Sequence, residues 1–271
     1  MIVADVIAKE LKKEGIRDIF MLTGYGAMYL NDAIEKNKIK YFAARNEAAA
    51  PMMAEAYAKA KGGIGAVCVT AGPGATNAIP GLAEAYVDSA PIVIISGTVE
   101  KKFTADDYKN LNIRTLGTAE FSVTKILKGI TKYSVSLKNP KNCLYEMQKA
   151  IHIAKTGRPG PVWVEVPLDV QSMKILDVKK LKKFIIKKKG YKKNISKIKS
   201  IVNQINHSKK PVFIIGNGLK QSNQLQNFLK ILKKTKIPFV SSRFANDLIT
   251  HDNKLNMGLL GIKGSLHTKE L

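Results

Sequence analysis

The sequence lacks any apolar run long enough to cross a membrane. Its most apolar stretch, residues 91–95, is far shorter than the roughly 18 residues that a spanning helix requires. Asp5 and Lys9 interrupt the N-terminus before an apolar run of signal-peptide length accumulates, which argues against secretion. Cysteine is also scarce, and Cys68 and Cys143 show no metal-ligand spacing. The sequence therefore predicts a soluble, cytoplasmic protein that binds no membrane.

Arginine is scarce as well, with 5 residues against 40 lysines, although the net charge is +24. Arginine forks are preferred for reading base edges, so this balance argues against sequence-specific nucleic-acid binding. The excess charge is confined to residues 121–271, which hold 31 basic and 7 acidic side chains, whereas residues 1–120 hold 14 of each. Between residues 174 and 199, twelve lysines accompany one acid, Asp177. We interpret residues 171–194 as a Lys-rich linker; a phosphate-binding patch is the less favoured alternative.

Strands and helices are expected to alternate along most of the 271 residues, a length that suits two domains. In the first part, strands are expected at 18–22, 40–44, 65–70, 91–96 and 162–166, with helices at 2–14, 28–35, 47–61, 76–87 and 144–155. This alternation predicts an α/β fold, a parallel sheet flanked by helices on both faces. Helices at 195–205 and 224–233 and strands at 211–215 and 238–240 predict an incomplete second α/β domain.

Glu47 is the first candidate for a catalytic group. It follows an expected strand, and ligands collect at the carboxyl edge of a parallel sheet. As an acid in the first turn of a helix it could instead only stabilise the helix dipole, by about 0.3–1 kcal/mol. The small residues 48–50 that follow favour close packing, where burial would raise the pKa of the carboxyl and suit it to share a proton.

Two glycine-containing loops are further candidates. In residues 71–77, Gly72 and Gly74 surround Pro73, so a rigid backbone could approach a flat ligand beside free helix N–H groups. An ordinary strand-to-helix turn has the same pattern. Gly216-Asn217-Gly218 is a weaker, partial dinucleotide fingerprint. The four histidines are scattered without metal-ligand spacing, so no metal site is predicted within the chain.

Four ordered motifs resemble those of acetolactate synthases and related thiamine diphosphate enzymes. They are Arg-Asn-Glu-Ala-Ala-Ala at 45–50, Val-Thr-Ala-Gly-Pro-Gly-Ala-Thr-Asn at 69–77, Ala-Tyr-Val-Asp-Ser-Ala-Pro at 85–91 and Gly-Arg-Pro-Gly-Pro-Val at 157–162. The resemblance is close over residues 1–170 and looser beyond them. It implies a flavodoxin-like pyrimidine-binding domain at 1–170, the linker at 171–194 and a partial central domain at 195–271.

The resemblance also implies an activity and a set of site residues. The complete enzyme would be a lyase or transferase acting on a 2-oxo acid such as pyruvate, with Glu47 as the catalytic residue that hydrogen-bonds N1′ of the aminopyrimidine. The family positions around the cofactor fall on Gly24, Tyr25, Gly26, Glu47, Gly72, Pro73, Gly74 and Asn77. Arg158 matches a position that contacts flavin, which makes FAD a candidate cofactor, but non-redox members dispense with flavin, so the resemblance leaves FAD binding open.

Three departures from the family pattern limit what the resemblance implies. Many acetolactate synthases have a histidine at the position of Asn46 and a glutamine at that of Ser122, so pyruvate condensation itself is in question. The Gly-Asp-Gly motif that binds Mg²⁺ and the diphosphate is absent, which implies that a missing C-terminal domain carries that site and that the chain alone is inactive. The complete enzyme would be a homodimer or homotetramer. A non-catalytic remnant or interaction module with the same fold is the alternative, and a nucleic-acid-binding protein, suggested by the net charge of +24, is a less favoured one.

Overall fold

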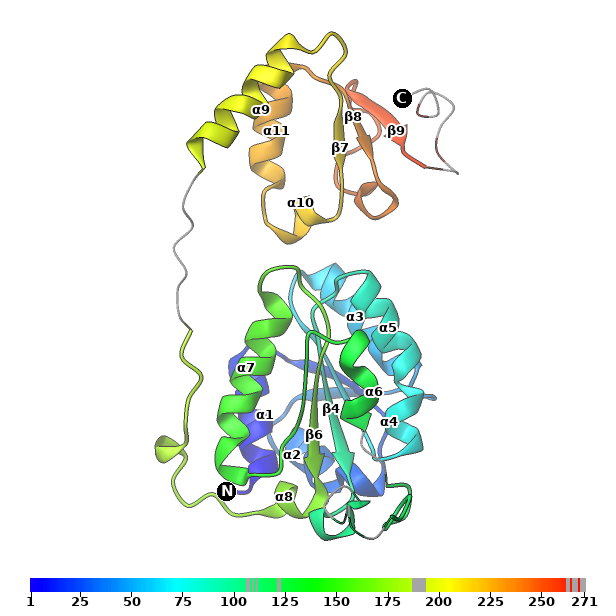
Figure 1. Cartoon of the computed structure of the whole chain (residues 1–271), viewed down its shortest axis with the longest axis vertical. Helices are drawn as coiled ribbons and strands as arrows, with labels where there is room; N and C mark the ends of the chain where they lie inside the picture. The colour runs from blue at the N-terminus through cyan, green and yellow to red at the C-terminus, as the bar shows by residue number, and fades with distance from the viewer. Residues whose placement is uncertain are drawn as a thin grey trace. The chain divides into compact units, whose positions relative to one another are not determined.

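The chain forms two compact units, Met1–Ile186 and Lys187–Leu271, each with its own sheet (Figure 1). The computed structural model describes residues 1–105, 108, 110, 112–120, 123–186, 194–261, 264 and 268. Ser122 and residues 187–193 of the expected linker lie outside the described residues. The division into two compact units does not define where a binding domain ends. The limits expected for the pyrimidine-binding domain, the linker and the central domain therefore stay predictions.

The first unit is built on a six-stranded parallel sheet with the order β2-β1-β3-β4-β6-β5. Strands β3, β4 and β6 are buried along their whole length, as parallel strands covered on both faces should be. The parallel α/β fold predicted from the sequence is therefore confirmed. The strands are β1 (Asp18–Met21), β2 (Lys40–Ala43), β3 (Gly65–Val69), β4 (Ile92–Thr98), β5 (Tyr133–Ser136) and β6 (Val162–Pro167).

Helices cover both faces of this sheet (Figure 1). Alternate strand residues point into two cores: on β4, Val93 and Ile95 belong to one and Ile92 and Ile94 to the other. The helices of the first core are α1 (Val3–Lys13), α2 (Met28–Lys36), α7 (Cys143–Lys155) and α8 (Leu168–Ser172). Those of the second are α3 (Ala49–Lys61), α4 (Pro73–Asn77), α5 (Ile79–Val87) and α6 (Val123–Ile126).

Three details of the first unit differ from the sequence prediction. The single helix expected over 76–87 is two helices, α4 and α5, because Pro80 stands in the first turn of α5 and begins a new helix there. The helix expected from Glu47 begins at Ala49, so Glu47 lies in the turn before α3 and not in its first helical turn. The edge strand β5 was missed, because its sequence Tyr-Ser-Val-Ser is short and only partly buried.

Residues 173–184 of the expected linker pack on the first unit. Ile175 and Leu181 are buried in the core that α1 and α7 share. Phe184 packs edge-on against Tyr145 of α7, with ring centroids 5.7 Å apart. Apolar side chains placed among the lysines therefore hold residues 173–184 against α7.

The second unit contains a three-stranded parallel sheet, β7-β8-β9. Its core is small and includes Ile215, Leu232 and Phe239. This confirms the second, smaller α/β domain expected from the sequence. The elements are α9 (Ile195–His207), β7 (Phe213–Ile215), α10 (Gly218–Gln221), α11 (Leu225–Thr235), β8 (Phe239–Ser241) and β9 (Asn256–Leu259).

Candidate functional site

The segments that carry the predicted cofactor residues leave the sheet at the same edge. Strand β1 pairs with β2 on one side and with β3 on the other, so the connections diverge around β1. In open parallel sheets, ligands bind beyond the carboxyl ends of the strands at such a switch point. Gly24 to Gly26 follow β1, Glu47 follows β2 and Gly72 to Asn77 follow β3. The strand order therefore brings all three segments to one place.

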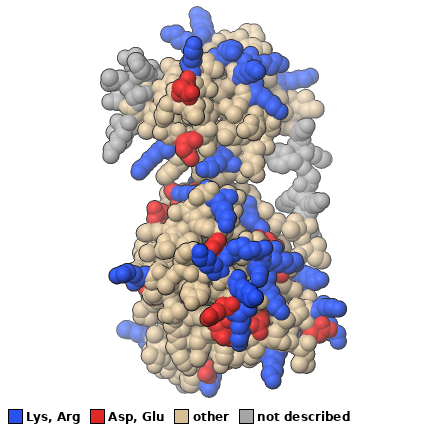
Figure 2. Space-filling view, turned by 180° about the vertical axis from the view of Figure 1, so that it is seen from behind, with Lys and Arg blue, Asp and Glu red and all other residues tan. Residues whose placement is uncertain are grey.

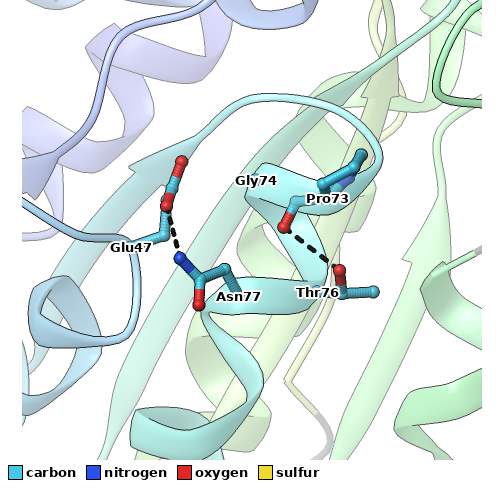
Figure 3. A pocket seen from close by; sticks show the side chains of 5 residues that line it. All are labelled: Glu47, Pro73, Gly74, Thr76 and Asn77. Atoms are coloured by element: carbon cyan, nitrogen blue, oxygen red, sulfur yellow. Dashed lines mark hydrogen bonds between the residues drawn. The ribbon is translucent and has the colours of Figure 1, made fainter.

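An open pocket with a volume of about 450 Å³ lies at this edge (Figure 3). Its lining consists of Glu47, Pro73, Gly74, Thr76 and Asn77. Four of these five residues were predicted as cofactor-binding residues. Thr76 was not, although it lies within the same motif; its Oγ1 donates to the carbonyl of Pro73 over 3.1 Å and tightens the first turn of α4.

Glu47 and Asn77 are joined across the pocket. The Asn77 amide donates from Nδ2 to Glu47 Oε2 over 2.8 Å (Figure 3). The other oxygen, Oε1, lies 3.1 Å from the point where a Cβ on Gly74 would stand. Glu47 is only half-buried, so the close packing expected around its carboxyl is partial. One carboxylate oxygen is thus held by an amide while the other faces a backbone without a side chain.

Asn46 has a local structural role. Its Oδ1 accepts a hydrogen bond from the backbone N–H of Ala48 over 2.7 Å, which shapes the turn that leads into α3. The side chain is exposed. The residue that stands in place of the family's histidine therefore supports the turn that carries Glu47.

The segment Gly24-Tyr25-Gly26 packs against the residue that follows β3. The N–H of Gly26 donates to Thr70 Oγ1 over 3.1 Å, and a Cβ on Gly24 would stand only 2.5 Å from Thr70 Cβ. Tyr25 is 72% exposed at the tip of this segment. Position 72 also requires glycine. Its φ of +57° lies in the left-handed region, and a Cβ there would collide with the carbonyl of Ala119.

Arg158 lies away from these residues. It precedes β6, whereas the pocket residues follow β2 and β3, so in this parallel sheet it stands at the opposite edge. Its Nε donates to Ser89 Oγ over 2.6 Å and its Nη2 to the carbonyl of Val87 over 3.4 Å. These bonds tie Arg158 to the loop before β4. Its contact with flavin stays a prediction.

Two buried ionisable groups lie close to the pocket elements. Burial raises the pKa of Glu55, on α3, and its ion pair with Lys59 opposes that rise; Lys59 also pairs with Asp88. Burial raises the pKa of the Cys68 thiol, on β3, to about 12.

Among the described residues, no group of three His, Cys, Asp or Glu side chains could hold a metal ion.

Basic side chains do not form a surface of one sign on the face shown in Figure 2. Lysines and arginines lie on both units there, with acidic side chains among them on each unit. Several of the described lysines have acidic partners, as in Lys36–Asp32 at 2.6 Å and Lys155–Glu14 at 2.7 Å. No helix in the described ranges is both long and apolar enough to cross a membrane. The charge pattern therefore gives no support to a nucleic-acid interface on this face.

Comparisons with known proteins agree with the motifs. Residues 1–116 match the family model for the thiamine pyrophosphate enzyme N-terminal TPP binding domain, and residues 198–271 match the one for the thiamine pyrophosphate enzyme central domain. The chain is 31% identical over 267 residues to the acetolactate synthase large subunit of Lactococcus lactis subsp. lactis, covering 97% of this chain and 44% of that protein. It is 31% identical over 270 residues to the probable acetolactate synthase large subunit of Methanocaldococcus jannaschii, with the same coverage of 97% and 44%.

A plant relative matches over a similar range. The chain is 30% identical over 272 residues to acetolactate synthase 2, chloroplastic, of Nicotiana tabacum, covering 97% of this chain and 39% of that protein. The chain thus spans less than half the length of the curated relatives that it matches.

Proposed function

Because the chain belongs to the thiamine pyrophosphate enzyme family, with matches to its N-terminal and central domains, we propose that the Glu47 pocket holds the aminopyrimidine ring of thiamine diphosphate. The observation that carries this proposal is the Glu47 carboxylate, fixed by Asn77 and set beside Gly74. The lining suits a flat, neutral ring, because Gly74 places no side chain beside Glu47 Oε1 and that carboxylate oxygen can share a proton with a ring nitrogen.

We further propose that the complete protein is a thiamine diphosphate-dependent lyase or transferase acting on a 2-oxo acid. When bound, thiamine diphosphate supplies the electron sink that decarboxylation of a 2-oxo acid requires. Glu47 would hold and exchange a proton at Oε1, and Asn77 would keep the other oxygen in place. The diphosphate and Mg²⁺ would be bound by residues outside this chain. The names of the relatives, acetolactate synthases, support this reaction class.

A second copy of the protein is the proposed partner. Helices α3 and α5 display Met52, Tyr86 and Val87, and Val87 is 70% exposed. Helices α3 and α5 pack on each other, and apolar side chains exposed on packed helices are the kind of surface that association can cover. We propose that the complete protein is a homodimer or homotetramer that covers these helices.

The cofactor proposal can be tested on the 271-residue chain with the aminopyrimidine fragment of thiamine as the probe. Labelling threonine with ¹³C′ and asparagine with ¹⁵N isolates the amide of Asn77, because Thr76-Asn77 is the one Thr-Asn pair in the sequence. We expect a saturable shift of this signal that Glu47→Ala abolishes and that Glu84→Gln, an exposed change on α5, leaves intact. The absence of any shift would contradict the proposal and favour a non-catalytic module.

A further inference from the structure

Thr70 lies between the two glycine-containing segments of the candidate site. It directly follows β3, and its Oγ1 accepts the hydrogen bond from Gly26 N over 3.1 Å. Its methyl carbon, Cγ2, lies 2.6 Å from the point where a Cβ on Gly74 would stand, so the two residues are in close contact. One side chain therefore contacts both segments. Its hydroxyl alone makes the hydrogen bond to Gly26, whereas its methyl carbon packs against Gly74 and also lies 2.8 Å from the point where a Cβ on Gly24 would stand.

Gly26 depends on side chains from outside its own segment. The residue is buried, and its N–H bonds to Thr70 while its carbonyl accepts a hydrogen bond from Gln171 Nε2 over 2.7 Å. Gln171 is fully buried. The Gly26 carbonyl also packs directly against Gly97 of β4, in the space that a Cβ on Gly97 would fill. This contact restricts the movement of Gly26 further. Buried backbone groups with such bonds are costly to release, so Gly26 keeps one position.

We propose that Thr70 is a positioning residue of this site. Its hydroxyl fixes the segment Gly24 to Gly26, and its methyl group seats the segment Gly72 to Asn77 against Glu47. The separation between the two sides of the pocket is then set by one side chain. This inference rests on the proposed function, because the two segments form the sides of a binding site only if a ring binds between them.

The hydroxyl and the methyl group can be removed separately, by Thr70→Val and Thr70→Ser. Tyr25-Gly26 is the one Tyr-Gly pair in the sequence, so ¹³C′-tyrosine with ¹⁵N-glycine isolates the amide of Gly26, and the Thr-Asn pair isolates that of Asn77. In Thr70→Val we expect hydrogen exchange at Gly26 to rise by about tenfold or more, because its buried N–H loses its acceptor, with Asn77 unchanged. In Thr70→Ser we expect the reverse: Gly26 protected, Asn77 shifted and faster to exchange.

A side chain that only fills space would give a different result. Both variants would then lower the thermal midpoint and change both reporters together. That outcome, or exchange at Gly26 in Thr70→Val within twofold of the parent, would overturn the proposal. The measurement uses no ligand, so it stands apart from the cofactor proposal, which the aminopyrimidine titration tests separately.

Discussion

Asn77 at the end of α4 holds Glu47 in the turn before α3 through a hydrogen bond of 2.8 Å from Nδ2 to Oε2. The two residues are separated by 30 positions and follow strands β3 and β2, which flank β1 in the sheet. Their contact therefore depends on the strand order β2-β1-β3 and not on local sequence. It also makes the orientation of the carboxylate a property of the fold, present without any bound cofactor.

The first prediction concerns the proton held by Glu47. In the complete enzyme, Glu47→Gln should lower turnover of a 2-oxo acid by at least about tenfold, because general acid–base groups contribute about 10²- to 10⁴-fold. The amide keeps the shape of the side chain, so the free energy of unfolding should change little. Steady-state kinetics with Glu84→Gln as the matched control is the measurement. Turnover within twofold of the parent would remove Glu47 from the mechanism.

The product of the complete enzyme is the second prediction. Asn46 supports a turn through its bond to Ala48 and, unlike histidine, has no group that titrates near neutral pH. We therefore expect little acetolactate when pyruvate is the sole substrate. Chromatographic analysis of the products is the measurement, with Asn46→His as a variant expected to raise the acetolactate yield. Acetolactate as the dominant product of the unchanged enzyme would contradict the prediction.

The sequence predicted the elements of the first unit well where apolar runs are buried on both sides. Strands β3, β4 and β6 are mostly apolar, with polar side chains only at Ser96, Thr98 and Glu165, and near-continuous apolar runs are the signal that buried parallel strands carry. The strand β5 carries no such signal, since its residues are partly buried at an edge. Glu47, Gly74 and Asn77 could be found from their motifs. The contacts of Thr70 could not, because they join residues 44 positions apart through the order of the strands.

The third prediction is about stability. Lys59 pairs with Glu55 and, at 2.5 Å, with Asp88, and both carboxylates are largely buried. Lys59→Met should lower the free energy of unfolding by about 2–3 kcal/mol, less than the about 3–5 kcal/mol of fully buried pairs, because Lys59 is partly exposed. Urea denaturation is the measurement. Lys36→Met, which breaks the exposed pair with Asp32, should cost much less, because water screens that pair.

The pH dependence of that variant has a definite sign. Burial raises the pKa of Glu55, and without Lys59 its charged form loses a counter-ion. The destabilisation should therefore shrink as the pH falls and Glu55 becomes protonated. Glu55→Gln added to Lys59→Met should recover part of the lost stability at neutral pH. A loss that is equal at acidic and neutral pH would mean that the ion pairs contribute nothing and that only packing was lost.

The fourth prediction is an alkaline loss of stability from Cys68. Burial raises the pKa of its thiol from 9.0 to about 12. Between these pH values the unfolded thiol ionises while the folded one keeps its proton, so the contribution of Cys68 to stability falls as the pH rises. Relative to Cys68→Ala, the parent should lose about 1.4 kcal/mol per pH unit in this window. A difference in unfolding free energy that stays constant from pH 8 to pH 11 would contradict the burial of the thiol.

The last prediction is the affinity of the 271-residue chain for the whole cofactor. Of the five residues that line the described pocket, one is charged, and it is the carboxylate of Glu47. Such a pocket grips a neutral ring through Glu47, Gly74 and Asn77 but offers no countercharge to a diphosphate, which needs cations to leave water. We expect a dissociation constant in the millimolar range or weaker, about 4 kcal/mol of binding free energy or less. Titration calorimetry with thiamine diphosphate and Mg²⁺ is the measurement, and the aminopyrimidine fragment alone should bind about as well. A micromolar constant for the whole cofactor would show that lysines elsewhere in this chain bind the diphosphate.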